Sequence, residues 1–187
     1  MGVTVADLEL FEKVSRAVLE SRELTFDYQK LRSSRHEARC VQPYHLGCIE
    51  NQWYLFGFDL ARQQLRTFAL PRMRKVRDTG AGFRRPADFS ITKHLSDSFG
   101  VFTGKGRHRV RIWFDAFAAR LVGERQWHPS QTIRQLRDGE IELSMTLGGL
   151  EEVERWALSW GEHARVLEPM ALKRQIRRVA EVILATH

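Results

Sequence analysis

The sequence predicts an α+β protein in which a helix and a small, strongly bent β-barrel precede an α/β sandwich. Three observations predict this class. The apolar period changes from helical spacing to strict alternation just after residue 22. Glycines cluster between residues 78 and 107, where we expect a connector. Beyond that stretch, strand and helix patterns follow the order β-α-β-β-α-β, which defines a ferredoxin-like sandwich.

The first helix is expected to end near Arg22. Thr4 and Asp7 have the spacing of a capping box, and apolar residues then recur at helical spacing. Strands follow at residues 24–28, 38–42, 53–59 and 65–70, with 73–76 extending the sheet. Pro43 should end or bend the second strand, because it lacks a ladder N–H. Several short strands joined by tight turns predict the bent barrel.

The second half has an equally clear order of elements. Strands are expected at 110–114, 130–136, 140–147 and 164–167, and helices at 116–124, 150–160 and 170–185. Asp138-Gly139 is a hairpin signal, and Gly161 ends a helix. We therefore divide the chain into residues 1–85 (helix and barrel), 86–106 (connector) and 107–187 (sandwich). Four tryptophans are expected in the sandwich core: Trp113, Trp127, Trp156 and Trp160.

Positive charge is concentrated in one third of the chain. The net charge is −3 over residues 1–27, +8 over 28–85 and +2 over 86–187, which gives the overall +7. A localised basic field favours a polyanionic partner such as nucleic acid or a nucleotide. A solvated basic surface without a ligand is the alternative.

No catalytic or metal-binding constellation is evident. The histidines lack metal-ligand spacing, and no carboxylate pair has an acid-base partner. Glu151, Glu152 and Glu154 stand at the start of a predicted helix, where negative charge favours the dipole. We therefore expect no enzymatic activity, no cofactor and no metal.

The sequence also favours a cytoplasmic protein. No apolar run approaches the roughly 18 residues that a membrane span needs, and no secretory signal is visible. Cys40 and Cys48 are expected to pack as small apolar residues in a reducing compartment.

Aromatic and basic residues alternate around the run Trp53-Tyr54-Leu55-Phe56-Gly57-Phe58-Asp59. Arginines can grip phosphates bidentately and rings can stack on bases, so this region is the candidate binding surface. Alternate strand positions point to opposite faces, which assigns about half of these aromatics to the barrel core.

These segments resemble the WYL domain, named for a Trp-Tyr-Leu triplet. The resemblance rests on Pro43-Tyr44-His45-Leu46, on the Trp53 run and on Arg66-Thr67-Phe68-Ala69-Leu70-Pro71-Arg72-Met73. The second half resembles the extension that follows this domain, at Arg125-Gln126-Trp127-His128-Pro129-Ser130-Gln131, Leu150-Glu151-Glu152-Val153-Glu154-Arg155-Trp156, Gly161 and Val166-Leu167-Glu168-Pro169. Together, the two resemblances imply an Sm-like, SH3-type barrel followed by a ferredoxin-like extension.

The resemblance also implies a function. Such domains form the sensory half of bacterial transcriptional regulators, often homodimers, which bind a single-stranded nucleic acid or nucleotide-like ligand in a basic pocket. The positions that carry over as ligand-binding candidates are Tyr44, His45, Trp53, Arg62, Arg66, Arg72 and Arg74.

One departure from the family pattern matters. Family regulators usually contact operator DNA through an N-terminal winged helix-turn-helix, and this sequence shows none. We expect either a piece of a longer regulator or a free-standing sensor that acts through a partner. A structural dimerisation module without its own ligand is the main alternative, and a nucleic-acid enzyme is the third.

Overall fold

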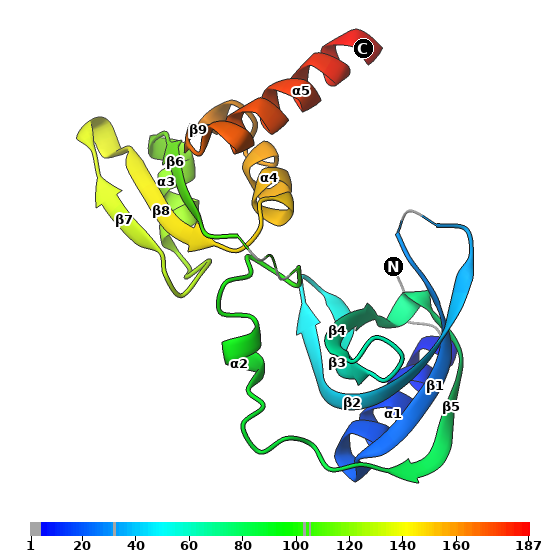
Figure 1. Ribbon diagram of the computed structural model, residues 1–187. Helices are drawn as coiled ribbons and strands as arrows, with labels where there is room; N and C mark the ends of the chain where they lie inside the picture. The colour runs from blue at the N-terminus through cyan, green and yellow to red at the C-terminus, as the bar shows by residue number, and fades with distance from the viewer. Residues whose placement is uncertain (1–4, 32, 103, 105) are drawn as a thin grey trace. The chain divides into compact units, whose positions relative to one another are not determined.

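The computed structural model describes residues 5–31, 33–102, 104 and 106–187 (Figure 1). The chain divides into two compact units, Met1–Ile91 and Thr92–His187. The finer division at residues 85 and 106 stays a prediction. Thr4 of the predicted capping box lies outside the described residues.

The first unit is a helix followed by a five-stranded antiparallel sheet. Its elements are α1 (Val5–Glu20), β1 (Arg22–Gln29), β2 (His36–Ile49), β3 (Gln52–Asp59), β4 (Gln64–Ala69), the 3-10 turn η1 (Leu70–Arg72) and β5 (Met73–Gly82). The strand order is β4-β3-β2-β1-β5. Within the described ranges the edge strands β4 and β5 are not paired with each other, so the sheet is open and the expected closed barrel is not found.

Strand β2 runs much further than the sequence indicates. It continues through Pro43, where the pairing with β3 shifts register between Pro43 and His45. This irregularity accommodates the residue without an N–H and leaves Tyr44 between the paired positions. The proline therefore bends the strand without ending it.

Gly57 permits the close approach of β2 and β3. A Cβ atom at Gly57 would lie 2.5 Å from Val41 Cγ1 and 2.8 Å from the Gln42 carbonyl oxygen. Only glycine fits such a contact without displacing backbone.

The core of the first unit lies between α1 and one face of the sheet. Val14 and Ala17 of α1 are buried against strand residues that include Leu24, Phe26 and Leu55. Phe26 and Phe68 meet edge to face with 5.2 Å between their ring centroids. Burial of these apolar side chains drives the packing of helix on sheet.

The second unit places three helices against a four-stranded antiparallel sheet. The short helix α2 (Ile91–His94) begins at the last residue of the first unit. The elements that follow are β6 (His108–Phe114), α3 (Ala116–Gly123), β7 (Thr132–Gln135), η2 (Arg137–Gly139), β8 (Ile141–Leu147), α4 (Glu151–Leu158), η3 (Gly161–His163), β9 (Ala164–Glu168) and α5 (Met170–Thr186). The strand order is β7-β8-β6-β9. From β6 to β9 the elements follow the predicted order, and both residues of the predicted Asp138-Gly139 turn have positive φ angles.

Three of the four tryptophans expected in the core lie there. Trp127, Trp156 and Trp160 pack against the buried cluster formed by β6, β8, α3 and α4, and the Trp127 and Trp156 ring centroids are 4.7 Å apart. The prediction for Trp113 is wrong. Strand alternation sends Val110, Ile112 and Phe114 into the core and Trp113 to the opposite face of the sheet.

Glu152 does more than place a negative charge at the start of α4. Its carboxylate accepts hydrogen bonds from the backbone N–H groups of Gly100 (2.9 Å), Val101 (2.8 Å) and Phe102 (3.2 Å). A carboxylate can satisfy several backbone donors at once. Glu152 therefore ties residues 100–102 to the first turn of α4.

No helix in the part of the chain described by the structure is long and apolar enough to span a membrane.

Cys40 and Cys48 both lie in β2 as free thiols. Cys40 is partly buried, but Cys48 is exposed, because the long β2 carries it beside Trp53 near the end of the β2–β3 hairpin.

Candidate functional site

A pocket of about 650 Å³ lies beside the irregularity in β2. Residues 83–87 and 89–91, which follow β5, form most of its wall, and His45 contributes from the strand. The chemically relevant lining side chains are His45, Phe83, Arg84, Arg85, Phe89 and Ser90. The wall therefore combines two guanidinium groups, one imidazole and two rings.

Backbone and aromatic contacts hold the 83–91 segment against the sheet. The Phe83 N–H donates to the Ser21 carbonyl oxygen (3.0 Å), and Arg85 Nη1 donates to the Tyr44 carbonyl oxygen (2.8 Å). The Tyr44 ring lies 5.8 Å from the Phe83 ring and 5.1 Å from the Phe89 ring, measured between centroids. Tyr44, which is 6% exposed, thus supports the wall from behind.

His45 is a neutral polar group in this wall. Burial lowers its pKa below the usual 6.5, and the nearby positive charge of Arg85 lowers it further. The ring stands across the β2–β3 pair from Phe56, with 6.2 Å between centroids. A neutral imidazole can both donate and accept a hydrogen bond, so His45 suits a polar ligand group.

Arg84 and Arg85 were missed as site residues by sequence reasoning. Their signal was the run Phe83-Arg84-Arg85-Pro86, which adds to the charge excess but shows no spacing relation to His45. The bond from the Phe83 N–H to Ser21, at the start of β1, folds this run back against the sheet.

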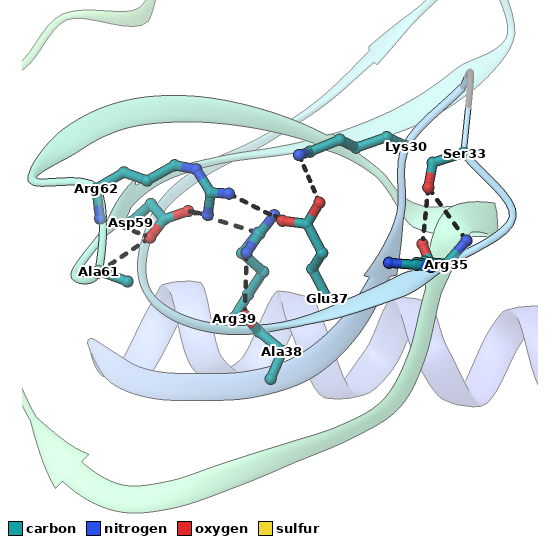
Figure 2. Close-up of polar contacts among 9 residues, drawn as sticks. All are labelled: Lys30, Ser33, Arg35, Glu37, Ala38, Arg39, Asp59, Ala61 and Arg62. Atoms are coloured by element: carbon teal, nitrogen blue, oxygen red, sulfur yellow. Dashed lines mark hydrogen bonds and ion pairs between the residues drawn. The ribbon is translucent and has the colours of Figure 1, made fainter.

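Arg62 belongs to a network of charges within the sheet (Figure 2). Its guanidinium lies 2.9 Å from a Glu37 carboxylate oxygen and 3.4 Å from the carboxylate of Asp59. Arg39, whose side chain is 6% exposed, bonds to the same two acids, and Lys30 pairs with Glu37. Lys30 and the arginines lower the pKa of Glu37 to about 2. Arg62 is therefore already engaged in neutralising carboxylates.

The other four candidates lie outside the pocket wall. The Trp53 ring packs on Phe11 of α1, with 4.7 Å between centroids. The Arg72 guanidinium lies 5.7 Å from the centroid of the Tyr28 ring. Arg66 and Arg74 are exposed on the edge strands β4 and β5. The structure thus brings Tyr44 and His45 together at the pocket, and the ligand role of all seven residues stays a prediction.

The pocket chemistry suits an anionic ligand that carries a ring. Its exposed arginines can bind a phosphate bidentately, and its rings offer apolar faces for stacking. None of the residues lining this pocket carries a carboxylate. Among the residues that the structure describes, no group of three or more His, Cys, Asp or Glu side chains could hold a metal ion.

The fold defines a protein of two α+β units, each built on an antiparallel sheet. Residues 9–78 match the WYL domain family, and residues 106–184 match the WCX domain family. The chain belongs to the WYL-domain family, with a WCX domain after its WYL domain.

Curated relatives match over most of this chain. Protein PafC of Mycobacterium tuberculosis is 25% identical over 175 residues, which cover 91% of this chain and 52% of PafC. Protein PafB of Mycobacterium leprae is 28% identical over 172 residues, which cover 88% of this chain and 50% of PafB. The chain spans about half the length of these relatives.

Two solved structures are also similar. Proteasome accessory factor B/C (PafBC) of Arthrobacter aurescens shares 24% identity over 90% of this chain and 26% of its own, with a TM-score of 0.45. A CRISPR Cas-related protein aligns over 96% of this chain and 51% of its own, with a TM-score of 0.60 and 10% identity. The second likeness shows a shared fold.

Proposed function

We propose that this chain is the ligand-sensing regulatory module of a bacterial transcriptional regulator. The observation that carries the proposal is the pocket in which Arg84, Arg85 and His45 face a common space beside Phe83 and Phe89. Membership of the WYL-domain family and similarity to PafB and PafC support it. We propose that the module is a binding protein and not an enzyme, and the match to the WYL domain supports this.

The proposed ligand is a single-stranded nucleic acid or a nucleotide-like anion. Arg84 and Arg85 would bind phosphate, His45 would hydrogen-bond to a base or sugar, and Phe89 would contact a base. Bidentate arginine contacts suit phosphate, and ring stacking tolerates any base. The excess of +8 over residues 28–85 would attract such a ligand from solution.

We further propose that the units are an Sm-like domain and a ferredoxin-like domain. The helix before an antiparallel sheet of order β4-β3-β2-β1-β5 supports the first assignment. The order β7-β8-β6-β9, with helices after β6 and β8, supports the second. Both are small scaffolds that present strands to a ligand.

The proposed partners are a second copy of the chain and, in a longer protein, operator DNA. PafB and PafC extend to about twice the matched length, which leaves room for a helix-turn-helix domain. Ligand binding would then shift the population between two arrangements of the dimer.

A structural dimerisation module is the second candidate function. The observation that favours it is the apolar surface at the end of α5, where Val182 is 57% exposed, Ile183 50% and Leu184 81%. Exposed apolar patches often mark protein interfaces. This candidate predicts dimers with no affinity for nucleotides.

Fluorescence polarisation with labelled single-stranded DNA and RNA separates the two candidates. The ligand-sensing function predicts binding that Arg85→Ala weakens and that Arg16→Ala, an exposed arginine on α1, leaves unchanged. Equal affinities of wild type and Arg85→Ala for both probes would reject the pocket. Complete absence of binding, with a dimer in solution, would favour the dimerisation module.

A further inference from the structure

The sheet of the second unit has a face that its core does not use. The residues of α3, α4 and α5 in the core cluster all meet one face, through Val110, Ile112 and Phe114 of β6 and their neighbours. Alternation places Arg109, Arg111 and Trp113 on the other face. None of these three belongs to the core cluster found among the described residues.

The strand register builds one row of side chains across this face. Arg134 of β7 pairs with Glu142 of β8, Glu142 pairs with Trp113 of β6, and Trp113 pairs with Arg165 of β9. The neighbouring row brings together the hydroxyls of Thr132 and Ser144 and the guanidinium of Arg111. Directly opposed residues of neighbouring strands lie close enough to interact. The face therefore presents arginines, a ring and small hydroxyls on one surface.

Arg111 braces this surface and does not offer a free charge. Its guanidinium makes two bonds of 2.8 Å to the Glu142 carboxylate and one of 2.8 Å to Glu168. Arg111, with help from Arg134, lowers the pKa of Glu142 to about 2, so this acid stays ionised. The acidic charge at the centre of the face is thereby already compensated.

Two other arginines remain available. Arg109 is exposed, and no ion pair involves it in the described part of the chain. The Arg134 side chain is 65% exposed and contacts Glu142 through one nitrogen, at 2.7 Å. A guanidinium has five donors, so Arg134 keeps most of its capacity for another acceptor.

Trp113 is held in a fixed orientation beside these charges. Its indole N–H donates to Glu140 Oε2 at 2.9 Å, and the Arg165 guanidinium lies 4.8 Å from the ring centroid. A guanidinium over a ring is a favourable arrangement, and the pair offers a planar surface at low entropic cost. Nucleic-acid bases stack on such rings and on guanidinium planes.

We propose that this face is a second binding surface, specific for single-stranded nucleic acid. Arg109 and Arg134 bind backbone phosphates, and one base stacks on the Trp113–Arg165 pair. The partner is nucleic acid because the four arginines of this face, Arg109, Arg111, Arg134 and Arg165, outnumber its three acids, Glu140, Glu142 and Glu168, each of which already accepts a hydrogen bond from a neighbouring side chain. A four-stranded antiparallel sheet with stacking groups on its inner strands is a recurrent single-strand platform. The surface is independent of the pocket proposed for the first unit.

Photo-crosslinking locates the contact directly. The whole chain is irradiated with single-stranded DNA of about 16 nucleotides that contains 5-bromodeoxyuridine, long enough for several stacked bases. Mass spectrometry then identifies the crosslinked peptides. Adducts on the β6 peptide at Trp113 are expected. Crosslinks confined to residues 83–91 would overturn this surface while supporting the pocket.

Variants then test the assigned roles by fluorescence polarisation. Arg109→Ala and Arg134→Ala should each lower the slope of log affinity against log salt by about 0.7. Trp113→Ala should weaken binding about tenfold, whereas Trp113→Phe, which keeps a ring and most of the packing, should retain most of it.

Arg120→Ala, an exposed arginine in α3, is the charge-matched control and should change neither affinity nor slope. An equal loss in Arg120→Ala would mean non-specific attraction and would overturn the proposal. So would unchanged binding in the Arg109→Ala/Arg134→Ala double variant, which leaves the folded core untouched.

Discussion

Arg85 donates a hydrogen bond of 2.8 Å to the carbonyl oxygen of Tyr44, and so joins the 83–91 segment to the irregular part of β2. The same guanidinium lines the pocket beside His45. Because a guanidinium has five N–H donors and this bond uses only Nη1, Arg85 can bind an anion in the pocket and keep its bond to Tyr44. Residue 91 is the last residue of the first unit. The segment that forms most of the pocket wall is therefore also the C-terminal segment of that unit.

Arg85→Ala should loosen the 83–91 segment without unfolding the unit. The lost hydrogen bond is exposed on the donor side, so we expect the free energy of unfolding to fall by under about 1 kcal/mol. Hydrogen exchange measured by mass spectrometry should be faster for residues 83–89 than in wild type and unchanged in β1. Equal protection of this segment in both proteins would show that Arg85 does not hold it.

The low pKa of His45 predicts a loss of stability in acid. Burial, and then the charge of Arg85, keep this pKa below 6.5, so the unfolded chain takes up a proton first as the pH falls. The contribution of neutral His45 to the free energy of unfolding is fully present above about pH 6.5 and decreases as the pH falls below that value. Urea unfolding at about pH 8 and pH 5 should show a smaller pH effect for His45→Gln than for wild type. A larger effect in the variant would contradict the sign.

The charge network around Asp59 should be structural. Asp59 is fully buried and Arg39 nearly so, so Asp59→Ala leaves a buried guanidinium poorly compensated and should cost about 3 kcal/mol. Arg62→Ala should cost about 1 kcal/mol, because its side chain is 28% exposed and Arg39 still faces Asp59. Chemical denaturation gives both values. An Asp59→Ala protein as stable as wild type would show that the network does not stabilise the fold.

Gly57→Ala should destabilise the first unit by about 2 kcal/mol, because the new methyl group overlaps Val41 and the Gln42 carbonyl. Gly47→Ala in β2 is the matched control, since its Cβ would meet Phe56 at 3.4 Å. Thermal unfolding should rank Gly57→Ala well below Gly47→Ala, and the reverse order would contradict the observed register.

Local sequence pattern predicted most elements of this fold. Alternation located β1, β3, β4, β6 and β8, and glycine chemistry located the turn at Asp138. The length of β2 could not be predicted, because Pro43 reads as a stop unless the shift of its partner strand is known. The outward direction of Trp113 was predictable, since its neighbours Ile112 and Phe114 are apolar and alternate with it.

The residues that line the pocket were harder to predict than the fold. Tyr44 and His45 became candidates through the family resemblance. Arg84 and Arg85 are brought to the pocket by the contact between Phe83 and Ser21, which are about 60 residues apart in sequence. Such long-range placement has no local signal. The ligand role of Arg62 stays a prediction. Its ion pairs with Glu37 and Asp59 could not be predicted, because Glu37 is distant in sequence and the burial of Asp59 has no local signal.

The salt dependence of oligonucleotide binding tests the proposed pocket most directly. If Arg84 and Arg85 bind phosphates, the slope of log affinity against log salt for single-stranded DNA should fall by about 1.4 in the Arg84→Ala/Arg85→Ala protein. Arg16→Ala should keep the wild-type slope. Identical slopes for the double variant and wild type would contradict a phosphate-binding pocket at His45.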